Sequence, residues 1–474
     1  MDISIDLTWL LVGGQIPNPF QLFWVLFLHG GWIFLSGLTV VGIFLGWHQG
    51  RVNRHRSEIE YIYLAVDVPK DNEQSLKAIE QIFAQLAGIE ESLNFRKKWI
   101  EAKVHETFSL ELISIEGFVQ YIIRTAKEYR DVVESAIYSQ YPDAEITQVE
   151  DYAKEFHHLT FPSEDYDLWG TEFTFIKSDA YPIRTYEHFE QAISEKKFAD
   201  PMAALLESMG HLGPGEQFWL QLVLTPIEQE WQEKSHHKVK ELIGADVHKE
   251  DRMGKYVFKS LEFMGDQLFM PTEAAGGKHE EKGPPSQMQY LTEGQKTTVL
   301  AIEEKAGKIG YKVKFRIVYL AKKEVFHKGR GVAPMGGAIL QFNDMNLNGF
   351  KPRKKTKTSG GQIFQKRRLA WRQRKILHHY IDRIDHAEGG HGIVLNIEEL
   401  ASLYHFPLID VKAPLVKKVE AKKGEPPATL PTELGQPVPH SRRSAVKTAS
   451  PAEEAPPTLP TEEASGPPAN LPVA

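Results

Sequence analysis

One stretch near the start of the chain is uncharged, and it constrains every other inference. Residues 20–47 contain no Lys, Arg, Asp or Glu and are mostly aliphatic or aromatic. A helix needs roughly 20 mostly apolar residues to cross the hydrocarbon core of a bilayer, and it satisfies its own backbone hydrogen bonds there. Trp24 and Trp47 lie near the two ends, and indole rings favour the membrane interface. The stretch therefore predicts a single transmembrane helix over residues 20–47.

Two other kinds of apolar segment fit this stretch less well. A cleaved signal peptide has a basic leader and a shorter apolar run, whereas this leader carries Asp2 and Asp6 and no basic residue. A soluble core helix that is apolar on all sides is uncommon. His29 is followed by Gly30 and Gly31, and small residues let a second transmembrane helix approach closely. A histidine within the membrane can instead mark a functional site. A homo-oligomer also stays open.

The flanking charges predict the orientation of this helix. Arg51, Arg54 and Arg56 follow the stretch directly, and no Lys or Arg precedes it. Lys and Arg next to transmembrane helices stay on the cytoplasmic side. We therefore expect residues 1–19 outside the cytoplasm, the three arginines at the membrane interface, and the rest of the chain inside the cytoplasm.

Composition is ordinary apart from the absence of cysteine. A chain of 474 residues is long enough for about two or three domains. The hydrophobic fraction of 42% allows a core of normal size. The formal charge of −7 is small for this length and indicates no particular partner. Because the chain has no cysteine, disulfides, thiolate metal sites and cysteine nucleophiles are excluded.

Hydrophobic periodicity predicts an α+β module over residues 57–150. Apolar residues repeat at helical spacing in two segments and alternate with polar residues in others. The predicted order is strand, helix, two strands, helix and strand, which is the split βαβ plan of the ferredoxin-like fold. The predicted strands centre on residues 60–66, 108–112, 118–123 and 144–149, and the helices on residues 76–86 and 129–137.

A second, decorated module of the same kind is predicted over residues 216–350. An aromatic and irregular connecting segment, residues 151–215, precedes it. Apolar residues alternate with polar ones over residues 218–224, as in a half-buried strand. A helix and a strand are predicted over residues 295–308 and 311–319, which suggests an internal duplication. The predicted fold class is therefore α+β, with a transmembrane helix ahead of two ferredoxin-like modules.

A basic helix and a C-terminal helical segment are predicted over residues 351–415. Asn396 is followed three residues later by Glu399, which fits a capping box at the start of the last helix. From residue 416 the chain is rich in proline, and the sequence Pro-Pro-Ala-Thr-Leu-Pro-Thr-Glu at 426–433 returns in similar form at 456–463. Such a composition cannot bury enough apolar area to offset its conformational entropy. Residues 416–474 are therefore predicted to be disordered.

The sequence lacks the motifs of nucleotide hydrolysis, metal-dependent hydrolysis and serine catalysis. No Gly-x-x-x-x-Gly-Lys-Ser/Thr, Gly-x-Gly-x-x-Gly, His-Glu-x-x-His or Gly-x-Ser-x-Gly occurs. Four potential metal ligands lie near one another at the end of a predicted helix, namely His378, Asp382, Asp385 and His386. Their spacing is more typical of a solvated helix face. We predict no enzymatic activity, no cofactor and no metal site.

The densest basic stretch spans residues 351–375 and contains no acidic residue. Its cations are Lys351, Arg353, Lys354, Lys355, Lys357, Lys366, Arg367, Arg368, Arg372, Arg374 and Lys375. One interpretation is contact with phosphate groups, in nucleic acid or in anionic lipid, and Phe364 and Trp371 would suit base stacking. The other interpretation is an exposed basic helix that docks on acidic groups of a protein.

Six short segments occur in an order shared with a known class of proteins. The more specific ones are Tyr-Pro-Asp-Ala-Glu-Ile at 141–146 and Asn-Ile-Glu-Glu-Leu-Ala at 396–401, and the weaker ones lie at 110–114, 181–183, 200–201 and 404–407. They resemble the N-terminal, non-motor region of bacterial conjugative-transfer ATPases of the type IV secretion and HerA-like class. The chain is also similar to an uncharacterised family of bacterial membrane proteins built from that region alone. The resemblance covers roughly residues 57–415 and does not include a motor domain.

The resemblance implies a single-pass subunit of a DNA- or protein-transfer machine in the bacterial inner membrane. Because the motor is absent from this chain, we expect a separate P-loop ATPase to dock on the two α+β modules. Two alternatives remain from the sequence. One is a membrane-tethered nucleic-acid-binding protein that acts through residues 351–375, and the other is a scaffold whose Pro-rich tail recruits a partner domain.

Overall fold

The computed structural model holds the whole chain, and its described part consists of eleven separate stretches. These are residues 18, 24, 27–28, 32–69, 74–89, 96–191, 200–227, 230–244, 290–359, 364–385 and 392–407, with side chains described for most of them. The predicted tail, residues 416–474, lies outside the described residues. So does the predicted extracytoplasmic segment, residues 1–19, apart from Asn18.

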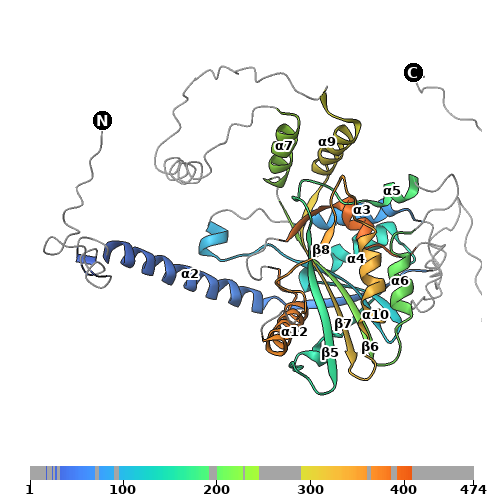
Figure 1. Ribbon diagram of the computed structural model, residues 1–474, viewed down its shortest axis with the longest axis horizontal. Helices are drawn as coiled ribbons and strands as arrows, with labels where there is room; N and C mark the ends of the chain where they lie inside the picture. Colours follow the sequence, from blue (N-terminus) through green and yellow to red (C-terminus); the bar gives the residue numbers. More distant parts are fainter. Residues whose placement is uncertain are drawn as a thin grey trace, which may run out of the picture. The chain divides into compact units, whose positions relative to one another are not determined.

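Helix α2 spans Trp32–Glu58 and is the first long element of the structure (Figure 1). It overlaps the predicted transmembrane helix at residues 32–47 and continues through the arginines that follow. A helix closes its hydrogen bonds within its own backbone, so its end need not coincide with the end of an apolar run. Of residues 20–31, only Trp24 and residues 27–28 are described. Among the helices that the structure describes, none is long and apolar enough to cross a membrane.

The described strands form one nine-stranded sheet in which paired neighbours are antiparallel. The order is β4-β1-β3-β2-β6-β7-β5-β8, and β9 pairs with β7. The α+β class predicted from the sequence is confirmed. The strands are β1 Tyr61–Asp67, β2 Phe108–Ile115, β3 Phe118–Ala126, β4 Glu145–Val149, β5 Tyr166–Phe175, β6 Glu216–Pro226, β7 Gly310–Lys322, β8 Phe350–Pro352 and β9 Ile393–Asn396.

Both predicted modules contribute strands to this single sheet. The junction is the pair β2 and β6, where Leu110 lies opposite Leu222 and Leu112 lies opposite Leu220. These leucines are buried in one core. The two halves therefore share a hydrogen-bonded sheet as well as a hydrophobic core, which the sequence did not indicate.

Strand β5 lies where the sequence predicted a connecting segment, residues 151–215. The structure places its ten residues between β7 and β8. Gly170 interrupts the apolar pattern of the strand, and close packing requires it there. A Cβ atom at this position would lie 3.0 Å from the carbonyl oxygen of Ile317 and 3.3 Å from the side chain of Ile376. A strand with an internal glycine and partners distant in sequence is hard to predict from its own residues. Because β5 belongs to the second half of the sheet, that half begins earlier than the predicted residue 216.

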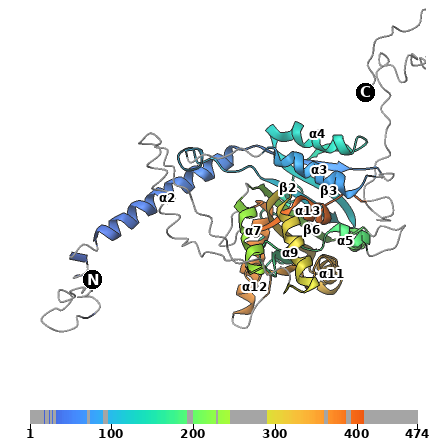
Figure 2. The same ribbon diagram turned by 90° about the horizontal axis from the view of Figure 1, so that it is seen from above.

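Helices cover both faces of the sheet, and side-chain alternation along the strands divides the core in two. In β6, Phe218 and Leu220 belong to the larger cluster and Trp219 to the smaller one. The larger cluster is covered by α3 Leu76–Ala87, α4 Arg130–Gln140, α6 Ala203–Gly210, α11 Ala333–Leu340 and α13 Ile397–Leu403. Helices α3 and α4 lie side by side over this face (Figure 2). The smaller cluster is covered by α12 Gln365–Ile381 and residues 152–161.

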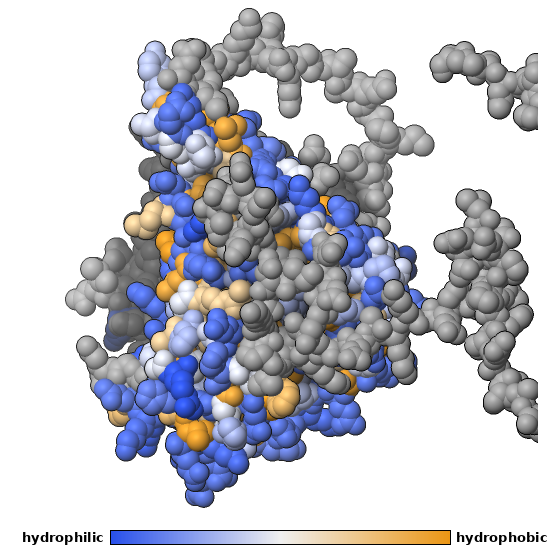
Figure 3. Space-filling model, turned by 90° about the vertical axis from the view of Figure 1, so that its right-hand side faces the viewer, coloured by the Kyte–Doolittle hydropathy of each residue, from blue (hydrophilic) through white to orange (hydrophobic). Residues whose placement is uncertain are grey.

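The remaining helices surround this body. Helices α7 Glu230–Leu242 and α9 Glu293–Ala306 pack on each other around Val299 and Ile302. The short helices are α5 Tyr186–Gln191 and α10 Lys328–Gly331, with single turns at Arg96–Ile100, Lys127–Tyr129 and Lys154–Phe156. The face of the body in Figure 3 is mainly hydrophilic, with scattered hydrophobic residues.

Candidate functional site

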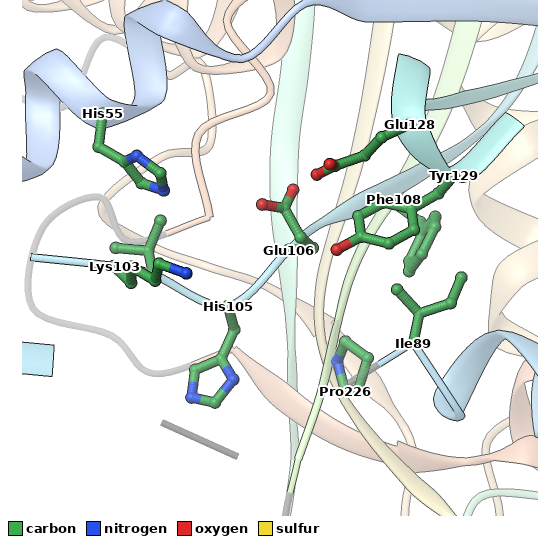
Figure 4. Close-up of a pocket in the computed structure, with 10 residues that line it drawn as sticks. His55, Ile89, Lys103, His105, Glu106, Phe108, Glu128, Tyr129 and Pro226 are labelled. Carbon is green, nitrogen blue, oxygen red and sulfur yellow. The ribbon is translucent and has the colours of Figure 1, made fainter. Parts of the chain in front are cut away.

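A cavity of about 360 Å³ lies where the last turns of α2 meet the body (Figure 4). Five parts of the chain that are distant in sequence line it: α2, the end of α3, the segment before β2, the turn after β3 and the end of β6. The lining residues are His55, Ile89, Lys103, Val104, His105, Glu106, Phe108, Glu128, Tyr129 and Pro226. The cavity therefore exists only once α2 and both halves of the sheet are in place.

Two carboxyl groups dominate the electrostatics of this cavity. The carboxyl groups of Glu106 and Glu128 point toward each other in Figure 4. Burial raises the pKa of Glu106, and the negative charge of Glu128 raises it further. The Oε2 atom of Glu106 is buried and has no hydrogen-bond partner among the described residues. A positively charged group placed between the two carboxylates would favour their ionised forms and so lower the pKa of Glu106.

The other walls of the cavity supply an apolar side and further titratable groups. Ile89, Phe108 and Pro226 form the apolar side, and His55 enters from α2. Among the described residues, no group of three or more potential ligands is arranged to hold a metal ion. The lining therefore combines this apolar side with two carboxyl groups, the ammonium of Lys103 and the imidazoles of His55 and His105.

The basic stretch predicted from the sequence is divided by the structure into internal and external cations. Four of its members make contacts within the body. Arg353 pairs with Glu172 at 3.2 Å, and Lys351 donates to the carbonyl oxygen of Ile176 at 3.3 Å. Arg372 donates to the carbonyl oxygen of Ser359 at 2.6 Å, and the Lys375 ammonium lies 4.6 Å from the centre of the Trp371 ring. The external members, all exposed, are Lys354, Lys355, Lys357, Lys366, Arg367, Arg368 and Arg374.

The predicted membrane-interface residues lie on or before α2. Trp24 is 57% exposed and Trp47 is 49% exposed. The guanidinium of Arg51 lies 5.3 Å from the centre of the Trp47 ring, and Arg54 is exposed. Arg56 differs from the other arginines because it pairs with Asp385 at 3.1 Å. This pair joins the end of α2 to the turn after α12.

Of the four potential metal ligands near the end of α12, the three that the structure describes do not form one group. His378 Nδ1 lies 2.5 Å from a carboxylate oxygen of Asp382, whereas Asp385 is engaged with Arg56. His386 lies outside the described residues.

The structure also contains a polar row across the middle of the sheet that the sequence did not indicate. Glu111 of β2 lies opposite Gln221 of β6, and Gln221 lies opposite Arg316 of β7. Arg316 in turn lies opposite Glu172 of β5. Gln221 donates to Glu111 at 3.0 Å, and Arg316 donates to Gln221 and to Glu172, each at 3.0 Å. All four side chains are buried.

Glu172 shows how this row tolerates burial. Desolvation alone would raise the pKa of its carboxyl group. The imidazole of His379, 3.8 Å from Oε1, and the guanidinium of Arg316 outweigh it and hold the pKa below its usual range. The carboxylate therefore stays ionised inside the protein because the guanidinium of Arg316 and the side chain of His379, from two distant elements, lie beside it.

Arg383, in the turn after α12, closes the other end of the row. It donates to both oxygens of Glu111, at 2.9 and 3.1 Å, and to both oxygens of Asp151, at 2.6 and 2.8 Å. The hydroxyl of Tyr152 donates to Glu111 at 2.8 Å. Arg383 has a left-handed backbone, with φ 50°, which costs a non-glycine residue about 1–2 kcal/mol. The contacts of its guanidinium offset that cost.

A family model described as "Domain of unknown function (DUF8128)" matches residues 55–418. The chain belongs to this family. No curated protein matches the chain. The DUF8128 region contains all the lining residues of the cavity, the buried polar row and the basic stretch. The apolar part of α2, residues 32–47, precedes it.

Proposed function

We propose that this DUF8128 protein is a membrane-anchored, non-catalytic subunit of a transfer machine of the type IV secretion or conjugation kind. In this proposal residues 20–47 form a transmembrane helix in the bacterial inner membrane, with the N-terminus outside and the body in the cytoplasm. The body docks a separate P-loop motor ATPase. The observation that carries the proposal is the exposed apolar surface of α2.

Most apolar residues in the first half of α2 are exposed in the part of the chain that the structure describes. Ile33, Leu38, Val40 and Ile43 are between 59% and 68% exposed, although the helix carries no charge before Arg51. Soluble monomers rarely expose contiguous apolar patches larger than a few hundred Å². Residues 20–31 extend the uncharged run on the N-terminal side. Lipid acyl chains would cover such a surface, and Arg51 and Arg54 would then meet the headgroups.

We further propose that the body consists of two ferredoxin-like modules related by duplication. Four strands of each half follow the order fourth, first, third, second, read as β4-β1-β3-β2 and as β8-β5-β7-β6, and β9 is an additional strand that pairs with β7. The modules would meet edge to edge at β2 and β6. The buried polar row crosses that junction, which favours a rigid platform over two mobile domains.

The identity of the docked partner is supported by the sequence. The chain resembles the non-motor region of transfer ATPases over roughly residues 57–415 and contains no phosphate-binding loop. A platform that has lost its motor would need to bind one in another chain.

The proposal is tested by purifying the full-length protein in mild detergent and identifying the proteins that accompany it by mass spectrometry. A P-loop ATPase in stoichiometric amount is the expected result. An unrelated tagged single-pass membrane protein, prepared in the same way, controls for abundant ATPases. An ATPase-free preparation would contradict the docking role.

The anchor is tested separately with a variant that carries two charges on α2. Leu38→Lys with Ile43→Lys should move the protein out of the membrane fraction, because a lysine near the bilayer centre costs about 2.5–3.5 kcal/mol. The matched control is Val132→Lys with Ile309→Lys, which changes two exposed apolar residues of the body. If the α2 variant stays in the membrane fraction, the proposed anchor is wrong.

A further inference from the structure

We propose that the exposed cations before and within α12 form a binding surface for the phosphate groups of anionic lipid. The basic surface is defined as Lys354, Lys355, Lys357, Lys366, Arg367 and Arg368. The inference rests on the proposed function in one respect: the transmembrane anchor would hold this surface close to the membrane lipids.

The basic surface is unpaired within the part of the chain that the structure describes. No ion pair is found there for any of its six members, and all six are exposed. No Asp or Glu occurs in residues 351–381. The structure uses other cations of the same stretch for internal contacts, such as Arg353 with Glu172. The six members of the basic surface therefore have no evident structural task within the described residues.

Two exposed aromatic residues lie beside the basic surface: Trp371 on α12, and Phe364 directly before the helix. Phe364 is 72% exposed and Trp371 is 51% exposed. Helical residues three or four positions apart share a face, which aligns Arg367 and Arg368 with Trp371. The opposite face of the helix, including Ile376 and Tyr380, is buried against the sheet. Cations beside exposed indole and phenyl rings are the composition of helices that lie at a membrane interface.

The ion pair between Arg56 and Asp385 favours lipid over nucleic acid as the occupant. It joins the cationic end of α2 to the turn that follows α12, at 3.1 Å. Helix α12 is about 25 Å long at 1.5 Å per residue, so its start lies within about one helix length of the Arg56–Asp385 pair, which follows the proposed anchor along α2. A tethered surface meets anionic headgroups at a high effective concentration, whereas nucleic acid must be recruited from solution.

The test uses the full chain reconstituted in vesicles, with a single reporter on α12. Because the chain has no cysteine, Gln365→Cys gives one labelling site for a fluorescent dye at the exposed start of α12. Energy transfer from this dye to headgroup-labelled lipid is compared in phosphatidylcholine vesicles and in vesicles with roughly one-third phosphatidylglycerol. A dye at Glu324→Cys, on the body surface, controls for general crowding.

We expect energy transfer at position 365 to rise with phosphatidylglycerol and to fall as salt is added. The variant Lys366→Gln with Arg367→Gln and Arg368→Gln should weaken the response by about five-fold for each charge removed. The control variant Lys77→Gln with Lys240→Gln and Lys323→Gln has the same change in net charge and should respond like the parent protein.

The outcomes separate this inference from the proposed function. A chain that inserts in both vesicle types but shows no lipid-dependent transfer keeps the anchor and overturns the inference. A reporter that responds to added DNA but not to phosphatidylglycerol overturns it in favour of nucleic acid. A chain that does not insert contradicts the anchor. Its salt-sensitive binding from solution to the same vesicles would still support the basic surface, and lack of binding would overturn it.

Discussion

The guanidinium of Arg383 and the carboxylate of Glu111 form a buried two-point ion pair across 272 positions of the sequence. Arg383 is 4% exposed and Glu111 is fully buried. Arg383 belongs to the turn after α12, and Glu111 to β2 in the first half of the sheet. The pair therefore fixes the C-terminal end of α12 to the strand at which the two halves meet.

Removal of the cation should destabilise the protein strongly. In Arg383→Met, the charges of Glu111 and Asp151 would remain in a site built for a cation. Breaking a buried ion pair in this way costs about 3–5 kcal/mol. Urea denaturation followed by circular dichroism would measure the loss. Arg367→Met, which removes an exposed arginine, should change the free energy of unfolding by less than about 0.5 kcal/mol. Equal effects of the two variants would contradict the role given to Arg383.

The ion pair between Arg383 and Glu111 also predicts that the free energy of unfolding depends on pH. Burial raises the pKa of Glu111, but the charge of Arg383 outweighs it and the net pKa lies below its ordinary value of 4.5. The folded state therefore favours the ionised form. This contribution is complete above pH 4.5 and is lost as pH falls through the lowered pKa. The difference in unfolding free energy between the parent protein and Arg383→Met should shrink as pH falls below 4.5, whereas Arg367→Met should show no such trend.

The carboxyl group of Glu106 in the cavity should give the protein's stability the opposite pH dependence. The pKa of Glu106 is raised by burial and by Glu128, so the folded state holds the proton more tightly than the unfolded chain. Stability should fall as pH rises from the ordinary value of 4.5 through the raised pKa. Glu106→Gln should remove this loss and stabilise the protein at neutral pH by less than about 1 kcal/mol, because solvent screens a partly exposed carboxylate. Thermal melts across pH would test it, with exposed Glu233→Gln as the control. A destabilised Glu106→Gln would indicate that the carboxylate has a favourable partner.

Substitution by alanine at two glycines should change the free energy of unfolding in opposite directions. A Cβ atom at Gly392 would lie 2.4 Å from the carbonyl oxygen of Val313, so the pairing of β9 with β7 must shift. Gly392→Ala should cost about 1–3 kcal/mol. Gly337 lies within α11 and a Cβ atom there meets nothing within 4 Å, so Gly337→Ala should stabilise by up to about 1 kcal/mol. Denaturation midpoints of the two variants would test the prediction, which is wrong if both shift in one direction.

The capping residue Glu399 should be coupled to a distant lysine. Its carboxylate lies 3.0 Å from Lys305, and both side chains are fully buried. Lys305→Met should cost about 3–5 kcal/mol, because it leaves Glu399 buried without its cation. The double variant with Glu399→Gln should lose less than the sum of the two single variants. Additive losses in this double-mutant cycle would show that the two residues act independently.

Local chemistry was readable from the sequence. The capping box of Asn396 and Glu399 was predicted from spacing alone, and the structure contains both of its hydrogen bonds. The strand and helix order of residues 57–150 was also predicted, since apolar residues repeat with period 2 in a strand and 3.6 in a helix within a short segment of sequence. The membrane span stays a prediction, because part of residues 20–47 lies outside the described residues.

The tertiary structure decided the parts that depend on distant partners. Glu111 alternates with Leu110 and Leu112, a pattern typical of a strand with one solvated face. Glu111 is buried instead, because Arg383 and Gln221, which are distant in sequence, donate hydrogen bonds to its carboxylate. Burial of a charge is unfavourable for any segment alone and becomes tolerable only when the partner is in place. For that reason the sequence by itself determined the elements of residues 57–150 and the cap at Asn396, while strand β5, the joined sheet, the cavity and the buried polar row required the assembled fold.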